Sequence, residues 1–203
     1  MKTSFLQRKA RYFLQTGTVA FILTTFSLMA QAQNRWSIEF RPGVNFATKK
    51  LADADLKTGF GAGAIISYRF LPHLGLYTGW SWNRFNASQS FAGVETDFEE
   101  TGYNYGLQFI HPIGDSRINY LIRAGGLWNH IEVEATDGNL VADSGHGFGW
   151  QAELGLAMLL DDHWRVQPGV RYRSLARDLS VGSVSNAVDL KYISVGLGIV
   201  RTF

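Results

Sequence analysis

Apolar and polar residues alternate along most of the chain from Trp36 onward. One parity carries large apolar side chains and the other carries small or polar ones, as in the stretch WSIEFRPGVNF at residues 36–46. This period-two pattern is typical of strands with one apolar face. It recurs in eight segments, at about residues 36–46, 59–70, 74–83, 102–109, 118–131, 147–158, 164–173 and 189–203. In the fifth segment the parity changes near Gly125 and Gly126, where a β-bulge would account for the change.

The connections between these segments alternate in length. Those at residues 71–73, 112–116 and 161–163 are tight, whereas those at about 47–58, 84–97, 132–146 and 175–188 are longer and polar. Tight turns at one end and long loops at the other are typical of an up-and-down antiparallel sheet. Eight strands joined in this way can close into a barrel, which leaves no unpaired edge.

Two closed barrels fit this pattern. A soluble ligand-binding barrel of the lipocalin type would turn its apolar parity inward, whereas a membrane barrel would turn it outward. The interior of eight strands is only just wide enough for side chains to fill. The apolar parity carries Trp80, Trp82, Phe148, Trp150 and Trp164, which are difficult to pack in so narrow a space. The small and polar parity fits it better.

Aromatic residues of the apolar parity also gather at two levels, with smaller aliphatic residues between them. One group lies near the tight turns, namely Trp36, Phe70, Phe109, Tyr120, Trp164 and Phe203, and the other near the long loops, namely Phe46, Phe60, Trp82, Tyr103, Trp128, Phe148 and Tyr172. Amphipathic rings favour the two interfaces of a bilayer. The sequence therefore predicts an all-β protein, an eight-stranded antiparallel up-and-down transmembrane β-barrel.

The first 32 residues differ in kind from the rest. A basic start with Lys2, Arg8, Lys9 and Arg11 precedes an apolar stretch and the small-x-small site Ala30-Gln31-Ala32. These are the parts of a secretory signal peptide, with cleavage expected before Gln33. The apolar stretch is shorter than a membrane anchor requires. We therefore expect a cleaved signal peptide at residues 1–32 and a barrel domain at residues 33–203.

Composition narrows the function classes. The chain of 203 residues has no cysteine, 18% charged residues and 14% aromatic residues. Disulfides and thiolate metal sites are therefore excluded. The leader holds four basic and no acidic residues, so its removal changes the formal net charge from +2 to −2. A nearly neutral exported chain does not have the basic footprint of a nucleic-acid-binding protein.

The end of the chain carries a resemblance to a known family. Val195, Leu197, Ile199 and Phe203 resemble the C-terminal signature of bacterial outer-membrane barrels, an alternating strand that ends in Phe. Residues 35–203 as a whole resemble the small OmpA/OmpX-like outer-membrane β-barrel family. The resemblance implies insertion into the outer membrane by the barrel-assembly machinery, contact with lipopolysaccharide, periplasmic termini and extracellular long loops. Arg201 departs from the signature, which usually has an apolar residue there.

The predicted inward parity carries a polar network. Its candidate members are Glu39, Arg41, Gln108, Arg123, Gln151, Glu153, Arg171 and Arg173. Charges in a narrow interior must pair or form hydrogen bonds, because an isolated buried charge is costly. We therefore expect a polar plug. A narrow anion-selective pore is the alternative, because arginines outnumber glutamates on this parity.

The long loops hold the remaining candidate chemistry. His130 and His146 flank a loop that contains Ser144, so a lipid A-modifying hydrolase is an alternative function. However, Glu132 rather than Ser follows His130 two residues on, and these polar residues also fit a solvated loop. A second loop holds an acidic cluster, Glu95, Asp97, Glu99 and Glu100. No spacing specific to a metal site occurs, and we expect no cofactor and no enzymatic activity.

Loops on a rigid scaffold commonly carry recognition. We therefore expect a structural or interaction role, in envelope integrity, adhesion or assembly, with a loop partner that the sequence does not identify.

Overall fold

The computed structural model describes residues 34–135, 137–181 and 184–203. Residues 35–202 form one compact unit. The expected signal peptide lies outside the described residues. Among the described residues, no helix has the length and hydropathy that a membrane-spanning helix requires.

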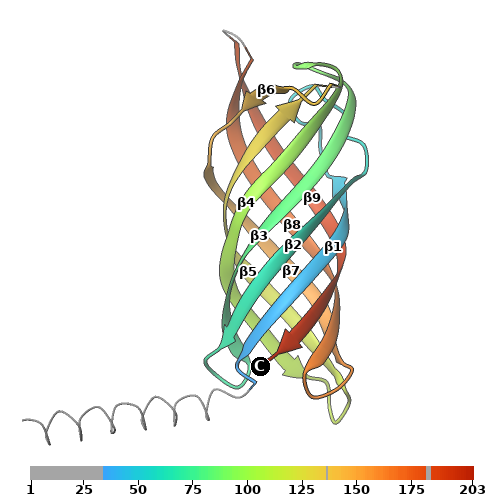
Figure 1. The fold of residues 1–203 in the computed structure, drawn as a ribbon, viewed down its shortest axis with the longest axis vertical. Helices are drawn as coiled ribbons and strands as arrows, with labels where there is room; N and C mark the ends of the chain where they lie inside the picture. Colours follow the sequence, from blue (N-terminus) through green and yellow to red (C-terminus); the bar gives the residue numbers. More distant parts are fainter. Residues whose placement is uncertain (1–33, 136, 182–183) are drawn as a thin grey trace, which may run out of the picture. The chain divides into compact units, whose positions relative to one another are not determined.

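Nine antiparallel strands make up the sheet (Figure 1). They are β1 (Trp36–Ala47), β2 (Gly59–Arg69), β3 (Leu74–Ser90), β4 (Gly93–Pro112), β5 (Ile118–Glu134), β6 (Leu140–Asp143), β7 (Gly147–Leu159), β8 (Trp164–Val181) and β9 (Val184–Thr202). Each strand of the ring pairs with its neighbours in the chain, except that β5 pairs with β7, and β1 pairs with β9. The ring therefore contains eight strands, as predicted. The four-residue β6 lies outside it and pairs only with the extracellular end of β5.

The predicted direction of the two faces is confirmed. The side chain of Trp80 is 45% exposed and that of Trp150 is 53% exposed, whereas their inward neighbours Ser81 and Gln151 are 3% and 4% exposed. A soluble barrel would show the reverse. The large apolar side chains form the outer wall, where a bilayer offers them an apolar solvent.

Aromatic side chains on the outer wall contact one another at the two predicted levels. Trp36 packs on Tyr68, and Phe109 packs on Tyr120, near the tight turns. Near the other end, Phe60 packs edge-on against Trp82, with a centroid separation of 5.4 Å. Trp128 and Phe148 form a similar pair at 4.5 Å. These contacts cross neighbouring strands, so the rings form belts around the barrel.

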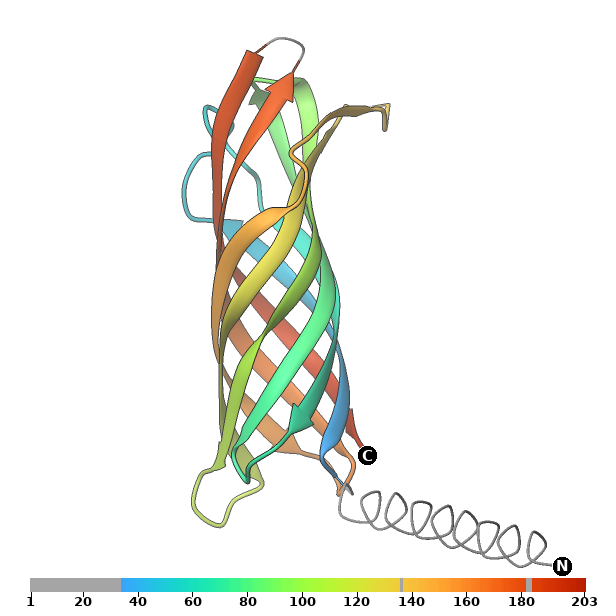
Figure 2. The ribbon, with the colours of Figure 1, turned by 90° about the vertical axis from the view of Figure 1, so that its left-hand side faces the viewer.

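The long strands differ from the sequence prediction, which assigned residues 84–97 and 175–188 to loops. Strands β3 and β4 continue to a turn at residues 91–92, and β8 and β9 are paired up to Val181 and Val184 (Figure 2). Along these extensions the hydrophobic parity inverts, because Phe85 and Leu175 lie on the inward parity of Asn83 and Arg173. Water replaces lipid beyond the outer aromatic belt, so apolar side chains turn inward there.

The inward apolar residues of the extensions form a core at the extracellular end. Its larger members are Leu51, Phe85, Phe98, Leu127, Ile131, Val133, Leu175, Leu179, Val188, Leu190 and Tyr192. Leu51 and Ala54 belong to the loop at residues 48–58, form an isolated β-bridge with each other and are 1% and 0% exposed. This loop therefore contributes two side chains to the core. We name these buried residues the extracellular apolar core.

Strand β5 contains no bulge at Gly125 and Gly126, which corrects a prediction. Its register with β4 and with β7 runs without a shift through both glycines. The apparent change of parity arises because Leu121 and Leu127 point inward, where each is at most 1% exposed. Leu127 belongs to the extracellular apolar core.

Candidate functional site

All eight residues of the predicted polar network lie inside the barrel. Each is at most 8% exposed. Four of them lie side by side in the strand register, where Gln108 of β4, Arg123 of β5, Glu153 of β7 and Arg171 of β8 are successive partners. Residues in one register row on one face of a sheet have neighbouring Cβ atoms, so their side chains can interact. In this row Glu153 lies between Arg123 and Arg171.

Two glutamates organise the centre of this network. The carboxylate of Glu39 accepts hydrogen bonds from Arg41 Nε at 2.5 Å and from Arg123 Nη2 at 2.6 Å. Glu153 accepts from Arg171 Nη2 at 2.7 Å and lies 3.0 Å from Arg41 Nη2 and 3.6 Å from Arg123 Nη1. Because Arg41 and Arg123 contact both glutamates, the five side chains form one connected cluster. Pairing of this kind offsets the cost of removing these charges from water.

A second cluster surrounds Arg173, nearer the extracellular apolar core. Arg173 Nη1 donates to Ser81 Oγ at 2.9 Å and to a carboxylate oxygen of Glu100 at 3.1 Å, and Arg173 Nε donates to Gln151 Oε1 at 3.0 Å. Tyr192 donates its hydroxyl to the same oxygen of Glu100 at 2.7 Å. These contacts join five strands at the level where the inward face changes from polar to apolar.

The sequence analysis missed several members of this interior. Glu100 is 0% exposed and lies on β4, so it is not in a loop as predicted. Asn83 and Asn129 both donate to its carboxylate. The available signal was its parity, because Glu100 shares the inward parity of Asn104 and Gln108 on β4. Gln167 and Tyr192 are also buried inside the barrel and were not predicted.

Arg177 binds the backbone at the start of β7, where the barrel wall is lower than on either side. This strand begins at Gly147, while its neighbours β5 and β8 continue farther. The Arg177 guanidinium donates to the backbone oxygens of Asn129 at 2.8 Å and Phe148 at 2.8 Å, and also to that of Gly147. Three backbone carbonyls at the start of β7 and on the facing part of β5 therefore receive a charged donor. Burial lowers the pKa of Arg177, although Glu100 opposes this shift.

The loop candidates form a separate cluster on the extracellular side. His130 Nδ1 lies 3.0 Å from Asp143 Oδ1 and 3.7 Å from Glu132 Oε1, and the His146 ring stacks on His130 at 4.4 Å. Hydrogen bonds from Gly145 N and His130 lower the pKa of Asp143, although burial opposes the shift. The donor atoms of His130, Glu132 and Asp143 lie within 4.8 Å of one another, which is compatible with weak cation binding.

Ser144 does not complete a hydrolytic arrangement with these histidines. Its hydroxyl accepts from Ile131 N at 2.8 Å and donates to Gly145 O at 2.9 Å. A nucleophilic serine requires a base within hydrogen-bond distance of its hydroxyl. In the described part of the chain, the hydrogen bonds of Ser144 Oγ go to backbone atoms.

The residues of the predicted assembly signal lie on the outer wall. Val195, Leu197 and Ile199 are 49%, 45% and 46% exposed, and Phe203 is 49% exposed. The Arg201 guanidinium lies 5.6 Å from the centre of the Trp164 ring, which is a cation–π distance. A long cation beside an interfacial Trp can extend its charged end toward the lipid headgroups. The role of this strand in assembly remains a prediction.

Comparisons with known proteins agree with this geometry. The chain matches the model of the outer membrane protein beta-barrel domain over residues 18–203. Its structure is similar to that of Neisserial surface protein A, with a TM-score of 0.63, 15% identity and coverage of 83% of this chain and 97% of that chain. It is also similar to outer membrane protein W of E. coli, with a TM-score of 0.57, 12% identity and coverage of 84% of this chain and 98% of that chain. For OprG from Pseudomonas aeruginosa the TM-score is 0.55 and the identity 16%, with coverage of 85% of this chain and 99% of that chain.

At these identities the solved structures establish the fold alone. The comparison with curated proteins gave no match. The inverted faces, the closed ring and the family match lead to one conclusion: this chain belongs to the outer membrane β-barrel domain family and is an integral protein of the outer membrane.

Proposed function

We propose that this protein is a non-conducting outer-membrane barrel with a structural or interaction role, exercised through its extracellular hairpins. The observation that carries the proposal is the sequence of layers inside the barrel. The ion-paired cluster of Glu39 and Glu153 is followed by the Arg173 cluster and then by the extracellular apolar core. An ion would have to leave water, break these pairs and cross an apolar layer, each of which is costly.

The extracellular hairpins support the interaction role. Strands β3 and β4 remain paired from Arg84 and Glu99 up to Ser90 and Gly93, so this segment is a continuous ladder rather than a free loop. A ladder with apolar side chains packed beneath it holds its outer side chains in fixed positions. Binding surfaces are commonly placed on such rigidly supported segments. Lipopolysaccharide is the partner expected around the outer wall, and the partner of the hairpins is unidentified.

Planar-bilayer recordings on the purified, refolded protein test the sealed interior. We expect no conductance steps from the wild-type protein. The variant Phe85→Ala/Phe98→Ala removes two large members of the extracellular apolar core and tests whether that layer limits leakage. Stable unitary steps from the wild-type protein would overturn the proposal in favour of a narrow channel.

The interaction role is tested with a shortened hairpin. Ala87 and Thr96 are register partners, so a two-residue Asn-Gly turn can replace residues 88–95 without a change of register. In a deletion strain, this variant should insert into the membrane as the wild type does but fail to restore surface binding or detergent resistance. Full restoration by the shortened variant would remove the β3–β4 hairpin from the proposal.

Lipid A analysis separates this role from hydrolysis. Mass spectrometry of lipid A from strains with and without the protein should show the same acyl chains. Loss of an acyl chain that depends on the protein would favour a hydrolase instead.

A further inference from the structure

The inward face of the barrel has a row of glycines at one level. Gly169, Gly196, Gly43 and Gly61 are successive register partners across β8, β9, β1 and β2. A row without side chains leaves free space in an interior that is otherwise filled. A cavity of about 30 Å³ lies there, and these four glycines belong to its lining.

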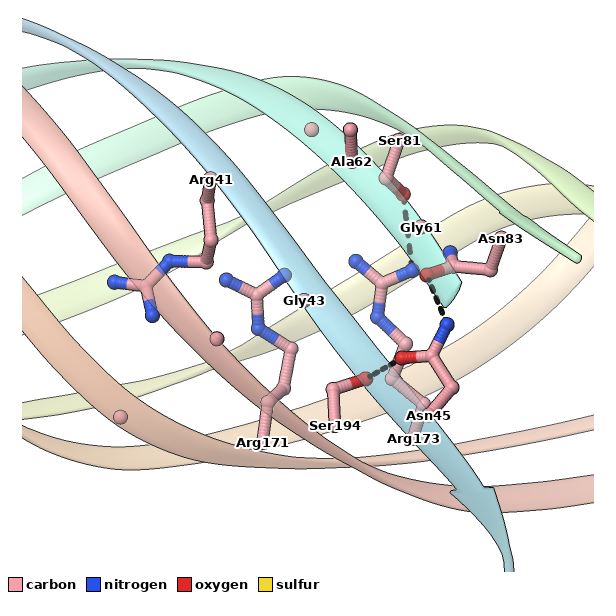
Figure 3. A pocket seen from close by; sticks show the side chains of 13 residues that line it. Arg41, Gly43, Asn45, Gly61, Ala62, Ser81, Asn83, Arg171, Arg173 and Ser194 are labelled. Carbon is pink, nitrogen blue, oxygen red and sulfur yellow. Dashed lines mark hydrogen bonds between the residues drawn. The ribbon is translucent and has the colours of Figure 1, made fainter. Parts of the chain in front are cut away.

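Three arginines line the same cavity. Arg41 approaches from β1, and Arg171 and Arg173 are neighbours on the inward face of β8; Figure 3 shows their guanidinium groups around this space. Asn45, Asn83, Ser81 and Ser194 also line it, and Ser194 already donates to Asn45 and Asn45 to Asn83. No carboxylate is among the lining residues. The cavity therefore has the composition of an anion site.

The buried charges do not balance within the described residues. The buried arginines are Arg41, Arg123, Arg171 and Arg173, whereas the buried glutamates are Glu39, Glu100 and Glu153. One positive charge is left over. An uncompensated charge in a medium of low dielectric constant is costly, and arginine does not lose its proton to avoid that cost.

The guanidinium of Arg173 also has a buried donor without a hydrogen-bond partner. Arg173 Nη2 has almost no accessible surface and no hydrogen-bond partner among the described residues, whereas Nη1 and Nε of the same guanidinium are engaged. In Figure 3 its free edge faces the guanidinium of Arg171 across the cavity. Buried polar groups without a partner are rare and often indicate a water or an ion.

We propose that this cavity binds one monovalent anion of chloride size between Arg171 and Arg173. The anion accepts a hydrogen bond from Arg173 Nη2, separates the two like charges on β8 and neutralises the excess charge of the interior. A volume of about 30 Å³ exceeds the 10–15 Å³ that one water needs and suits a halide better than a larger oxyanion. The site acts as a structural counter-ion site and is independent of the function proposed for the hairpins.

Bromide provides a direct test on the wild-type protein. Crystals of the refolded protein grown in sodium bromide should show an anomalous peak between the guanidinium groups of Arg171 and Arg173. Density for water alone, without anomalous signal, would overturn the proposal.

Thermal unfolding in micelles provides a second test. At equal ionic strength, sodium chloride should raise the unfolding midpoint relative to sodium gluconate, whose anion is too large for the cavity. At a chloride concentration ten times the dissociation constant, the rise should be roughly 3–6 °C. Arg173→Gln removes the excess charge and should abolish the difference between the two salts.

Arg165→Gln is the matched control. It removes the same charge from the same strand, but Arg165 does not line the cavity. This variant should keep the chloride response. Equal midpoints of the wild-type protein in both salts would contradict the site, as would a response that Arg173→Gln retains in full.

Discussion

Glu39 and Arg123 meet inside the barrel although 84 residues separate them in the chain, and Arg123 Nη2 donates to Glu39 Oε2 at 2.6 Å. The first residue lies on β1 and the second on β5, which are not neighbours in the ring. The pair therefore ties two distant parts of the wall together through the interior.

Removal of one partner should be costly. Glu39→Gln leaves Arg123 and Arg41 with fewer negative neighbours, and loss of one partner of a buried pair typically costs about 3–5 kcal/mol. Urea unfolding of the refolded protein in micelles measures this change. The control is Asp55→Asn, because Asp55 pairs with Lys50 at the surface, where its side chain is 76% exposed. Equal unfolding midpoints for the two variants would contradict a stabilising role of the buried pair.

The extracellular apolar core predicts a second effect. Phe98 is 0% exposed and packs near Phe91, so Phe98→Ala leaves a cavity. Such truncations cost about 3–5 kcal/mol. Val94 lies on the same hairpin but is 68% exposed, and Val94→Ala should change stability little. Unfolding curves of the two variants, recorded side by side, measure the difference. A small effect of Phe98→Ala would show that the hairpin does not depend on this core.

The outer wall predicts where a charge is not tolerated. Leu197 lies between Val195 and Ile199 on the outward face of β9, so Leu197→Arg places a cation in the middle of the apolar band. The expected cost is about 2–4 kcal/mol near the midplane of a bilayer. Folding into vesicles, followed by the mobility of the unboiled protein on gels, measures the yield. Val94→Arg is the control, because Val94 lies on the β3–β4 hairpin with its side chain 68% exposed. Equal yields would contradict the membrane-facing assignment of Leu197.

The Asp143 carboxylate predicts a pH dependence on the extracellular side. Its pKa in the folded protein lies below the ordinary value of 3.8, so its contribution is present above that pH and is lost as the pH falls through the lower, folded value. The protection factors of the β6 and Gly145 amides, corrected for the intrinsic exchange rate at each pH, should therefore fall below about pH 4. The accompanying change in stability is small because the Asp143 side chain is 42% exposed. Asp143→Asn should remove this acid-dependent step, and its persistence in the variant would assign it to another group.

The sequence predicted the ring and its inverted faces because lipid and the narrow interior impose opposite demands on alternate residues. Trp80 and Ser81 illustrate this contrast in adjacent positions. It did not reveal the hairpin extensions, because apolar residues were expected on the outward face along the whole length of each strand. Phe85 and Leu175 break that rule only because the solvent outside changes from lipid to water. An inversion of parity within an uninterrupted strand is therefore a signal for the end of the membrane-spanning part.

The inward parity also identified eight members of the polar network but not Glu100, which is the ion-pair partner of Arg173. Arg173 and Glu100 lie on β8 and β4, and the register alone does not bring them together. Long side chains that reach across an enclosed space are set by packing, which a pattern along one strand does not contain.

The seam between β1 and β9 has a consequence for how the chain reaches its final state. Ser37 pairs with Thr202, so the ring closes only when segments from opposite ends of the polypeptide meet. Until then, two rows of backbone amide and carbonyl groups stay unpaired, and each can template the addition of a foreign strand. Contacts of such long sequence separation form slowly. The open intermediate is thus the species most exposed to aggregation, and an escort that covers both edges would protect it during its passage to the bilayer.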